Sequence, residues 1–269
     1  MTLEPVLPAG EEPWSHTFVE ANGITFHAVE AGDGPLLVLL HGFPEFWYSW
    51  RHQIPALARH FHVVVPDMRG YNETDKPATG YDVRNLVEDV VAVARAFGSD
   101  HFLLAGHDWG GVVAWATAAR YPDKVSRLSI LNAPHPTLMA RALRSSPSQL
   151  KSSWYVFAFQ LRGWAERRLR RRNFAVLERI TRGQMVHPER FTDADLGRYR
   201  NAIARPRAVE CALEYYRAAF RGAVRDGMSV HDVFVSVPTQ VIWGEHDAAL
   251  GIGLLEGLET LVPGVRIDR

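Results

Sequence analysis

The chain lacks the residues that would tie it to a metal, a disulfide or a membrane. Its 269 residues include a single cysteine, Cys211, so it can form no internal disulfide, and it shows no Cys/His spacing typical of zinc. No apolar run approaches the roughly 18 residues of a transmembrane helix. We therefore expect no metal, no cofactor, and a soluble protein of the reducing cytoplasm.

An excess of charge of either sign is also absent. The 30 Lys and Arg residues balance the 30 Asp and Glu residues, so neither nucleic acid nor a membrane is predicted as a partner. The first residues, Met1 to Trp14, carry Pro and Glu where a secretion signal would have a basic start and an apolar stretch. The apolar residues, 47% of the chain, are ample for a large core.

Short apolar, β-branched runs alternate with helical patterns, which is typical of a parallel sheet flanked by helices. A hairpin comes first, because Asn22-Gly23 tolerates the positive φ angles of a tight turn. Helical spacing of apolar residues marks residues 82–97 and 111–121. Strands are predicted at residues 16–20, 24–29, 35–40, 61–65, 101–105, 127–131, 239–243 and 265–268.

The alternation stops after Pro136 and resumes at Pro238, with only helical patterns between. We predict an α/β fold: a mostly parallel twisted sheet with helices on both faces and an inserted helical cap. The predicted divisions are core residues 1–136, cap residues 137–231 and core residues 232–269. The arginine-rich run from Arg162 to Arg172 is interpreted as a solvated helix face without a function.

Asp108 lies at the centre of a glycine-flanked turn, Gly106-His107-Asp108-Trp109-Gly110-Gly111, between a predicted strand and a predicted helix. Small flanking residues let the chain reverse sharply while the central side chain stands above the sheet. A carboxylate at a helix N-terminus is kept ionised by the helix dipole and nearby N–H groups. We predict that Asp108 is a nucleophile, since the glycines exceed what a helix cap requires.

A second loop, His41-Gly42-Phe43-Pro44-Glu45, directly follows the strand predicted at residues 35–40. In this architecture such a loop supplies one backbone N–H of an oxyanion hole, and the residue after the nucleophile supplies the other. The predicted donors are the N–H groups of Phe43 and Trp109.

These motifs resemble those of the α/β-hydrolase superfamily, and specifically its epoxide hydrolases. The resemblance implies that fold and an enzyme that opens an epoxide through an Asp ester to give a vicinal diol. Its substrates would be a small apolar epoxide and water. The likeness extends from about residue 14 onward and rests on His41 to Glu45, Asp67-Met68-Arg69-Gly70-Tyr71 with Asp75-Lys76-Pro77, Gly106 to Gly111, and Trp243-Gly244-Glu245-His246-Asp247.

The resemblance also implies two cap tyrosines that hold the epoxide oxygen. The segment from Trp154 to Gln160 matches the first motif and points to Tyr155. The segment Ala212-Leu213-Glu214-Tyr215-Tyr216-Arg217 matches the second and points to Tyr216, with Tyr215 as the alternative. Ring opening leaves an alkoxide, which a phenol with an ordinary pKa of about 10 can both stabilise and protonate.

Asp247 matches the acid that orients the family's histidine by holding its tautomer. An apolar pocket is expected around Phe43, Trp109, Trp154 and Phe159, which favours aryl or long alkyl epoxides.

The C-terminal part departs from the family pattern. The chain ends at Arg269 and no histidine follows His246, so the last strand and the final helix are expected to be incomplete and the general-base histidine to be absent. Hydrolysis of the ester is then in doubt, because the remaining candidates, His41, His107, His135 and His246, are poor substitutes. A second copy, in a homodimer, could cover the apolar surface that a missing helix would bare.

Two other functions remain open at this point. A haloalkane dehalogenase also uses an aspartate followed by Trp, but it usually has Asn where this chain has Phe43. A non-catalytic ligand-binding protein would explain the lack of a general base. A serine esterase is excluded by Asp108, and a fluoroacetate dehalogenase would have Arg where Trp109 stands.

Overall fold

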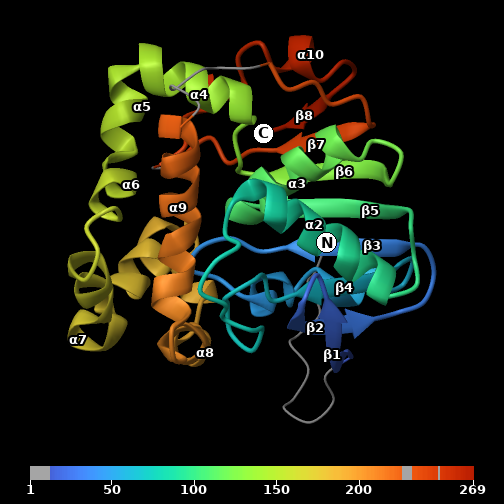
Figure 1. Ribbon diagram of the computed structural model, residues 1–269, viewed down its shortest axis with the longest axis horizontal. Coiled ribbons are helices and arrows are strands. Elements are labelled where there is room, and N and C mark those ends of the chain that lie inside the picture. Colours follow the sequence, from blue (N-terminus) through green and yellow to red (C-terminus); the bar gives the residue numbers. More distant parts are fainter. Residues whose placement is uncertain (1–12, 226–231, 248) are drawn as a thin grey trace.

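The computed structural model describes residues 13–225, 232–247 and 249–269. Within them, eight strands form one sheet in the order β1-β2-β4-β3-β5-β6-β7-β8 (Figure 1). The pairs β1–β2 and β2–β4 are antiparallel, and every pair from β4 to β8 is parallel. The strands are β1 (Ser15–Ala21), β2 (Ile24–Ala31), β3 (Leu36–Leu40), β4 (His62–Pro66), β5 (Phe102–His107), β6 (Val125–Leu131), β7 (Thr239–Ile242) and β8 (Arg266–Asp268).

Every predicted strand is present, with bounds that shift by a residue or two. The hairpin turn has φ 45° at Asn22 and 77° at Gly23, the left-handed conformations that a two-residue turn between twisted strands requires. All five residues of β3 are buried, because helices cover both faces of a parallel sheet. The mostly parallel sheet predicted from the sequence is confirmed.

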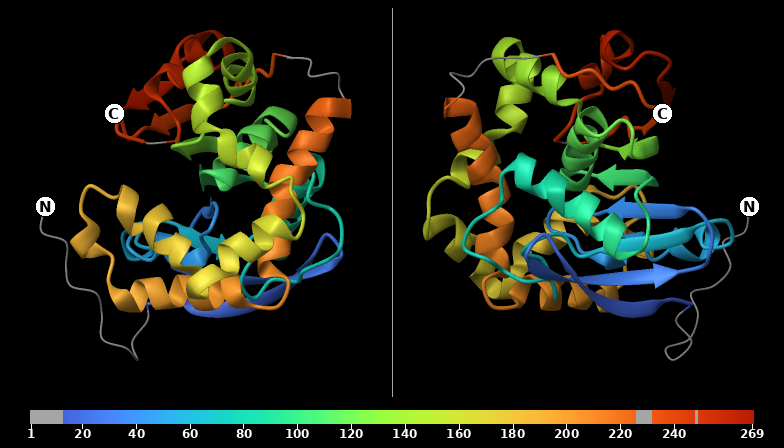
Figure 2. Two further views of the ribbon diagram at one scale, coloured as in Figure 1. Left: turned by 90° about the vertical axis from the view of Figure 1, so that its left-hand side faces the viewer. Right: turned by 45° about the vertical axis from the view of Figure 1, so that its right-hand side comes forward.

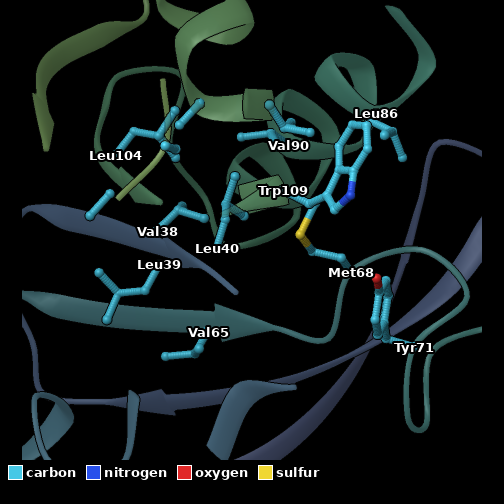
Figure 3. Close-up of a cluster of buried hydrophobic side chains, with 14 of the residues drawn as sticks. Val38, Leu39, Leu40, Val65, Met68, Tyr71, Leu86, Val90, Leu104 and Trp109 are labelled. Carbon is cyan, nitrogen blue, oxygen red and sulfur yellow. The ribbon is translucent and has the colours of Figure 1, made fainter. Parts of the chain in front are cut away.

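Two long helices, α2 (Val83–Ala96) and α3 (Trp109–Arg120), lie against each other in front of the sheet in Figure 1. Asp82 caps α2 by accepting a hydrogen bond from the Asn85 N–H at 3.2 Å. The buried face of α2 packs with β3 and β5 side chains and with the indole of Trp109 (Figure 3). This packing fixes the start of α3 above the sheet.

Between β6 and β7 the described residues form helices and no strand. The predicted boundary at residue 231 lies outside the described residues, as does the stretch before residue 13. In the right view of Figure 2 most of these helices lie to one side of the sheet, and in the left view they face the viewer in front of it. We call them the helical segment: α4 (Pro136–Ser145), α5 (Pro147–Ser152), α6 (Trp154–Ala158), α7 (Trp164–Ile180), α8 (Asp193–Ala204) and α9 (Ala208–Arg225).

Shorter helices complete the fold. None of the helices in the described part of the chain is long and apolar enough to cross a membrane. The short helices are α1 (Ile54–Leu57), α10 (Leu258–Leu261) and the 3-10 helices Trp47–Trp50, Arg182–Gln184, Pro188–Arg190 and Ile252–Leu255.

Arg217 of α9 connects the helices of the helical segment. Its side chain is 2% exposed and pairs with Glu166 of α7 at 2.9 Å and with Glu214 at 3.3 Å. Its Nε also donates to the carbonyl of Phe159 at 2.9 Å, just beyond α6. One buried cation therefore holds α6, α7 and α9 together.

Replacing Arg217 by Met should lower the free energy of unfolding by roughly 3–5 kcal/mol, because it leaves the carboxylate of Glu166 buried and unpaired. Urea denaturation followed by circular dichroism measures this. Arg95→Met, which removes an exposed ion pair with Asp100, is the matched control and should leave the midpoint almost unchanged. Equal effects of the two substitutions would refute the role given to Arg217.

Candidate active site

Asp108 joins β5 to α3 with φ 50° and ψ −120°. A non-glycine residue in this region is strained by about 1–3 kcal/mol. Its side chain makes no capping hydrogen bond to α3. Instead Oδ1 accepts a hydrogen bond from the Phe43 N–H at 2.8 Å. The strain therefore serves to hold the carboxylate against the loop that follows β3.

Two glycines let these loops meet. A Cβ on Gly42 would lie 2.3 Å from the Cβ of Asp108 and 2.6 Å from its Oδ1. A Cβ on Gly110 would lie 2.3 Å from the carbonyl oxygen of Leu40. Neither position can hold a side chain without moving backbone or the carboxylate.

The protonation of Asp108 depends on opposing effects. Burial raises the pKa of Asp108, while the charge of His107 and the N–H groups of Phe43 and Trp109 act against burial. From the sequence we expected the N-terminus of the helix to favour the ionised form of Asp108. In the structure burial has the larger effect, and the pKa of Asp108 lies above its ordinary value. Of the two N–H groups predicted for the oxyanion hole, that of Phe43 donates to this carboxylate, and that of Trp109 acts to lower its pKa.

Tyr155 of α6 and Tyr216 of α9 come together near Asp108. Their ring centroids are 6.0 Å apart, and the ring of Tyr216 lies 5.1 Å from Trp109 and 5.7 Å from Phe43. Burial, followed by the charge of Asp108, raises the pKa of both phenols. Both hydroxyls are therefore protonated at neutral pH and able to donate.

Tyr215 occupies a different environment from its neighbour. Its hydroxyl donates to the carbonyl of Arg69 at 2.8 Å, and its ring packs on Tyr71 and Tyr81. That hydroxyl is buried in a hydrogen bond to backbone, whereas the ring of Tyr216 packs against Trp109, which follows Asp108, and against Phe43, whose N–H binds Asp108. The geometry thus separates two tyrosines that the sequence left as alternatives.

Asp247 lies after β7 in a dense set of hydrogen bonds. Its Oδ1 accepts from the N–H groups of Ala249 and Leu250 at 2.8 and 2.9 Å. Its Oδ2 accepts from Nδ2 of Asn132 at 2.8 Å, and Oδ1 of Asn132 accepts from the Gly244 N–H at 3.0 Å. No histidine bonds Asp247 among the described residues.

The sequence reasoning missed Asn132. It follows β6 with φ 41°, a conformation that Asn tolerates better than most residues. An Asn at the end of a predicted strand was the only available signal, and it is a weak one. Its contact with Asp247 comes from parallel pairing of β6 and β7, which places both strand ends side by side.

His107 and Glu45 form an ion pair beside Asp108, with 3.0 Å between Nδ1 and Oε2. Burial alone would lower the pKa of His107, but the charge and hydrogen bond of Glu45 raise it to about 9. Burial alone would raise the pKa of Glu45, but His107 and the Gly42 N–H lower it to about 2. The imidazolium is the cation that opposes burial at Asp108.

The pair stabilises the fold within a defined pH window. Since the pKa of His107 is raised above its ordinary 6.5, its contribution is complete below that pH and is lost as pH rises through about 9. Since the pKa of Glu45 is lowered from 4.5, its contribution is complete above that pH and is lost as pH falls through about 2. The pair contributes most between these two ordinary values.

Glu45→Gln should therefore lower the pKa of His107 markedly, because the main cause of the upward shift is removed. Proton NMR of the imidazole across pH 5–10 measures it. The control is Glu256→Gln at an exposed glutamate. An unchanged titration of His107 in the Glu45 variant would contradict this electrostatic assignment.

Of the two remaining residues predicted to line the pocket, Phe159 lies beside Tyr216 and Trp154 does not. Phe159 lies 5.0 Å from Tyr216 and 5.8 Å from Phe43, between ring centroids. Trp154 does not join them: its side chain is 64% exposed, so its placement in the pocket is corrected. Successive helical residues point about 100° apart, and with Tyr155 turned inward Trp154 faces out.

The other histidines considered as general bases form no hydrogen bond with Asp108 in the described part of the chain. The ring of His41 is buried, with Nε2 accepting from the Met68 N–H at 2.9 Å and Nδ1 beside the carbonyl of Gly42 at 3.0 Å. His135 is 2% exposed, and burial lowers its pKa to about 4. His246 is exposed. In the described ranges no group of three or more His, Cys, Asp or Glu side chains could hold a metal ion.

The motif Asp67-Met68-Arg69-Gly70-Tyr71 holds loops in place by hydrogen bonds. Asp67, fully buried, accepts hydrogen bonds from the Trp47 N–H at 2.9 Å and from Nδ2 of Asn72 at 2.7 Å, and its Oδ2 lies 2.6 Å from Nδ1 of His27. Arg69 forms a bidentate pair with Asp89 of α2, at 2.7 and 2.6 Å. These bonds fix the loop that follows β4, in which the carbonyl of Arg69 accepts the hydrogen bond from the Tyr215 hydroxyl.

Comparison with known proteins agrees with this fold and arrangement. Residues 35–267 match the family described as alpha/beta hydrolase fold. The chain is 38% identical over 251 residues to AB hydrolase superfamily protein YfhM of Bacillus subtilis (strain 168), covering 91% of this chain and 86% of that protein. It is 34% identical over 258 residues to Epoxide hydrolase 2 of Caenorhabditis elegans, covering 92% and 72%.

A solved structure is similar over nearly the whole chain. It is a variant of an epoxide hydrolase from Bacillus megaterium complexed with its product, a naphthyloxy-propane-1,2-diol. The TM-score is 0.85 at 31% sequence identity, covering 94% of this chain and 91% of that one. The chain therefore belongs to the alpha/beta hydrolase family and, within it, to the epoxide hydrolase-like enzymes.

Proposed function

We propose that this protein opens small apolar epoxides by nucleophilic attack of Asp108, with Tyr155 and Tyr216 as proton donors to the epoxide oxygen. The observation that carries the proposal is the placement of two protonated phenols beside a carboxylate held by the Phe43 N–H at 2.8 Å. The helices bearing the phenols would act as a cap, corresponding to residues 137–231.

In the first step a carboxylate oxygen of Asp108 forms a bond to one epoxide carbon and the bond from that carbon to the epoxide oxygen breaks. The oxygen, now an alkoxide on the neighbouring carbon, takes a proton from a phenol. Each donor in such a water-poor site contributes roughly a hundredfold to a thousandfold in rate. The product is a hydroxyalkyl ester of Asp108.

In the second step water would attack the ester carbonyl, and the N–H groups of Phe43 and Trp109 would stabilise the resulting oxyanion. The water needs a general base, which Asp247 would orient. His107 is a poor base because its raised pKa, about 9, keeps it protonated at neutral pH. Because no histidine among the described residues bonds Asp247, we propose that the ester forms faster than these residues hydrolyse it.

The aromatic surroundings support aryl epoxides as the substrate class. The rings of Phe43, Trp109 and Phe159 surround Tyr216, and the Bacillus megaterium relative binds a product with a naphthyl group. We also propose that the protein is cytoplasmic, forms a homodimer and detoxifies epoxides.

Incubation with styrene oxide should add the whole mass of the epoxide to the protein, as measured by intact mass spectrometry. Asp108→Ala should abolish the adduct. With an alkyl halide in place of styrene oxide, an alkyl adduct with released halide would favour a dehalogenase. Absence of any adduct with either reagent would support a binding role and contradict the proposal.

Tyr216→Phe should slow adduct formation about a hundredfold, because it removes a donor to the leaving oxygen. Tyr215→Phe is the matched control, since its hydroxyl bonds the Arg69 carbonyl. That control should cost stability and leave the rate within a few-fold. A reversed pattern would assign the epoxide oxygen to Tyr215.

Gly42→Ala should also slow adduct formation strongly, because the added methyl overlaps Asp108. Gly251→Ala, at a position where a Cβ would meet nothing within 4 Å, is its control. The rate of mass increase measures both variants. Normal reactivity of the Gly42 variant would show that the close approach is not needed.

A further inference from the structure

The outer side of α5, α6 and α7 carries a row of exposed apolar side chains. They recur every three or four residues along three consecutive helices, a spacing that puts members of the same helix on one side of it. Backbone bonds from the Leu161 N–H to the Ala158 carbonyl, and from the Ala165 N–H to the Leu161 carbonyl, join α6 to α7 through a turn in which Gly163 has φ 75°. The row consists of Leu150 (44% exposed), Trp154 (64%), Phe157 (49%), Leu161 (57%) and Trp164 (46%).

This row is separate from the site. The opposite side of α6 supplies Tyr155 to the rings around Asp108. In Figure 1, α5, α6 and α7 form the left edge of the molecule, and α9 stands between them and the sheet. Five large apolar side chains exposed on neighbouring helices at such an edge, unlike single exposed residues, indicate an interaction surface.

Cations accompany the row. Six arginines lie between Arg162 and Arg172. In the first turns of α7, Ala165, Glu166 and Leu169 are buried, so the opposite side presents Trp164 together with Arg167 and Arg168. The one acid within this stretch, Glu166, is paired with the buried Arg217.

Most of this positive charge is not neutralised. Arg162 pairs with Glu214, and Arg170 pairs with Glu210. Arg168, on the same side of α7 as Trp164, is exposed and forms no ion pair with another part of the described chain. Arg171 and Arg172 are also exposed and without an ion pair there, but they lie in a kink of α7. The surface therefore combines tryptophan, aliphatic and phenyl groups with uncompensated guanidinium groups.

We propose that this face docks on the surface of an anionic lipid bilayer. Tryptophan rings prefer the headgroup level, neighbouring apolar side chains enter the acyl boundary, and arginines bind lipid phosphates. A second copy fits poorly, because a two-fold contact through this face would bring like-charged arginines together. The expectation of no membrane partner rested on a net charge averaged over the whole chain, which hides this local excess.

The docking does not depend on the proposed reaction, but it has a consequence for that reaction. Helix α6 would lie between the lipid and Tyr155, and a helix with its side chains is about 10 Å across. An apolar epoxide dissolved in the bilayer would thus be concentrated next to the site.

Flotation with vesicles of phosphatidylglycerol and phosphatidylcholine at about 0.1 M salt tests the proposal, with pure phosphatidylcholine vesicles as the neutral comparison. The protein should float with anionic vesicles and stay behind with neutral ones. Raising the salt to about 1 M should release much of it, since screening weakens the contribution of the arginines.

Two double variants should each weaken binding about tenfold or more: Trp154→Ser with Leu161→Ser, and Arg167→Glu with Arg168→Glu. The matched controls are Phe18→Ser, 58% exposed on β1, and Arg59→Glu, exposed after α1, and neither should change binding. All six substitutions lie on exposed side chains, so each of the four variants should keep the wild-type unfolding midpoint.

Three results would overturn the proposal: no binding to anionic vesicles, equal binding of both double variants and the wild type, or equal binding to neutral vesicles. Sedimentation equilibrium adds a fourth. If the wild type is a dimer that the Trp154/Leu161 variant dissociates, the face is an interface between copies. Adduct formation by the same variants should stay normal, which separates failure of docking from failure of the proposed chemistry.

Discussion

The close approach of the loop after β3 to Asp108 is the constraint on which the rest of the site depends. The Phe43 N–H reaches Oδ1 at 2.8 Å only because Gly42 has no side chain where Asp108 lies. The parallel pairing of β3 with β5 brings the two strand ends to the same edge of the sheet. The strained φ of Asp108 then turns its carboxylate toward the loop, and the helical segment is positioned to cover this edge.

The charged and polar groups around that contact set the protonation states of Asp108 and of the two phenols. Burial favours the neutral form of Asp108, while the imidazolium of His107, held by Glu45, favours the carboxylate. The phenols of Tyr155 and Tyr216 are kept protonated by burial and by the same carboxylate. One buried environment therefore makes the nucleophile less hydrated and keeps both phenols protonated before the reaction begins.

The sequence predicted the features that depend on short-range pattern. Strand bounds followed from short apolar runs, and the bounds of α2 and α3 followed from helical periodicity. The glycine-flanked turn located Asp108 because a sharp strand-to-helix reversal needs small residues. Tertiary contacts decided what the sequence could not. Asn132 reaches Asp247 only through strand pairing, Tyr215 differs from Tyr216 only in which bond its hydroxyl makes, and Trp154 faces outward because Tyr155 next to it is turned in. The roles of these residues in catalysis remain predictions.

The central claim is that an oxygen of Asp108, and no other group, forms the covalent bond to substrate. The most direct measurement is proteolysis of the protein after exposure to styrene oxide, with tandem mass spectrometry of the peptides. The account predicts that the modified fragment ion series places the whole added mass on Asp108. Modification of Glu45, Asp247 or a histidine, with Asp108 unchanged, would contradict it.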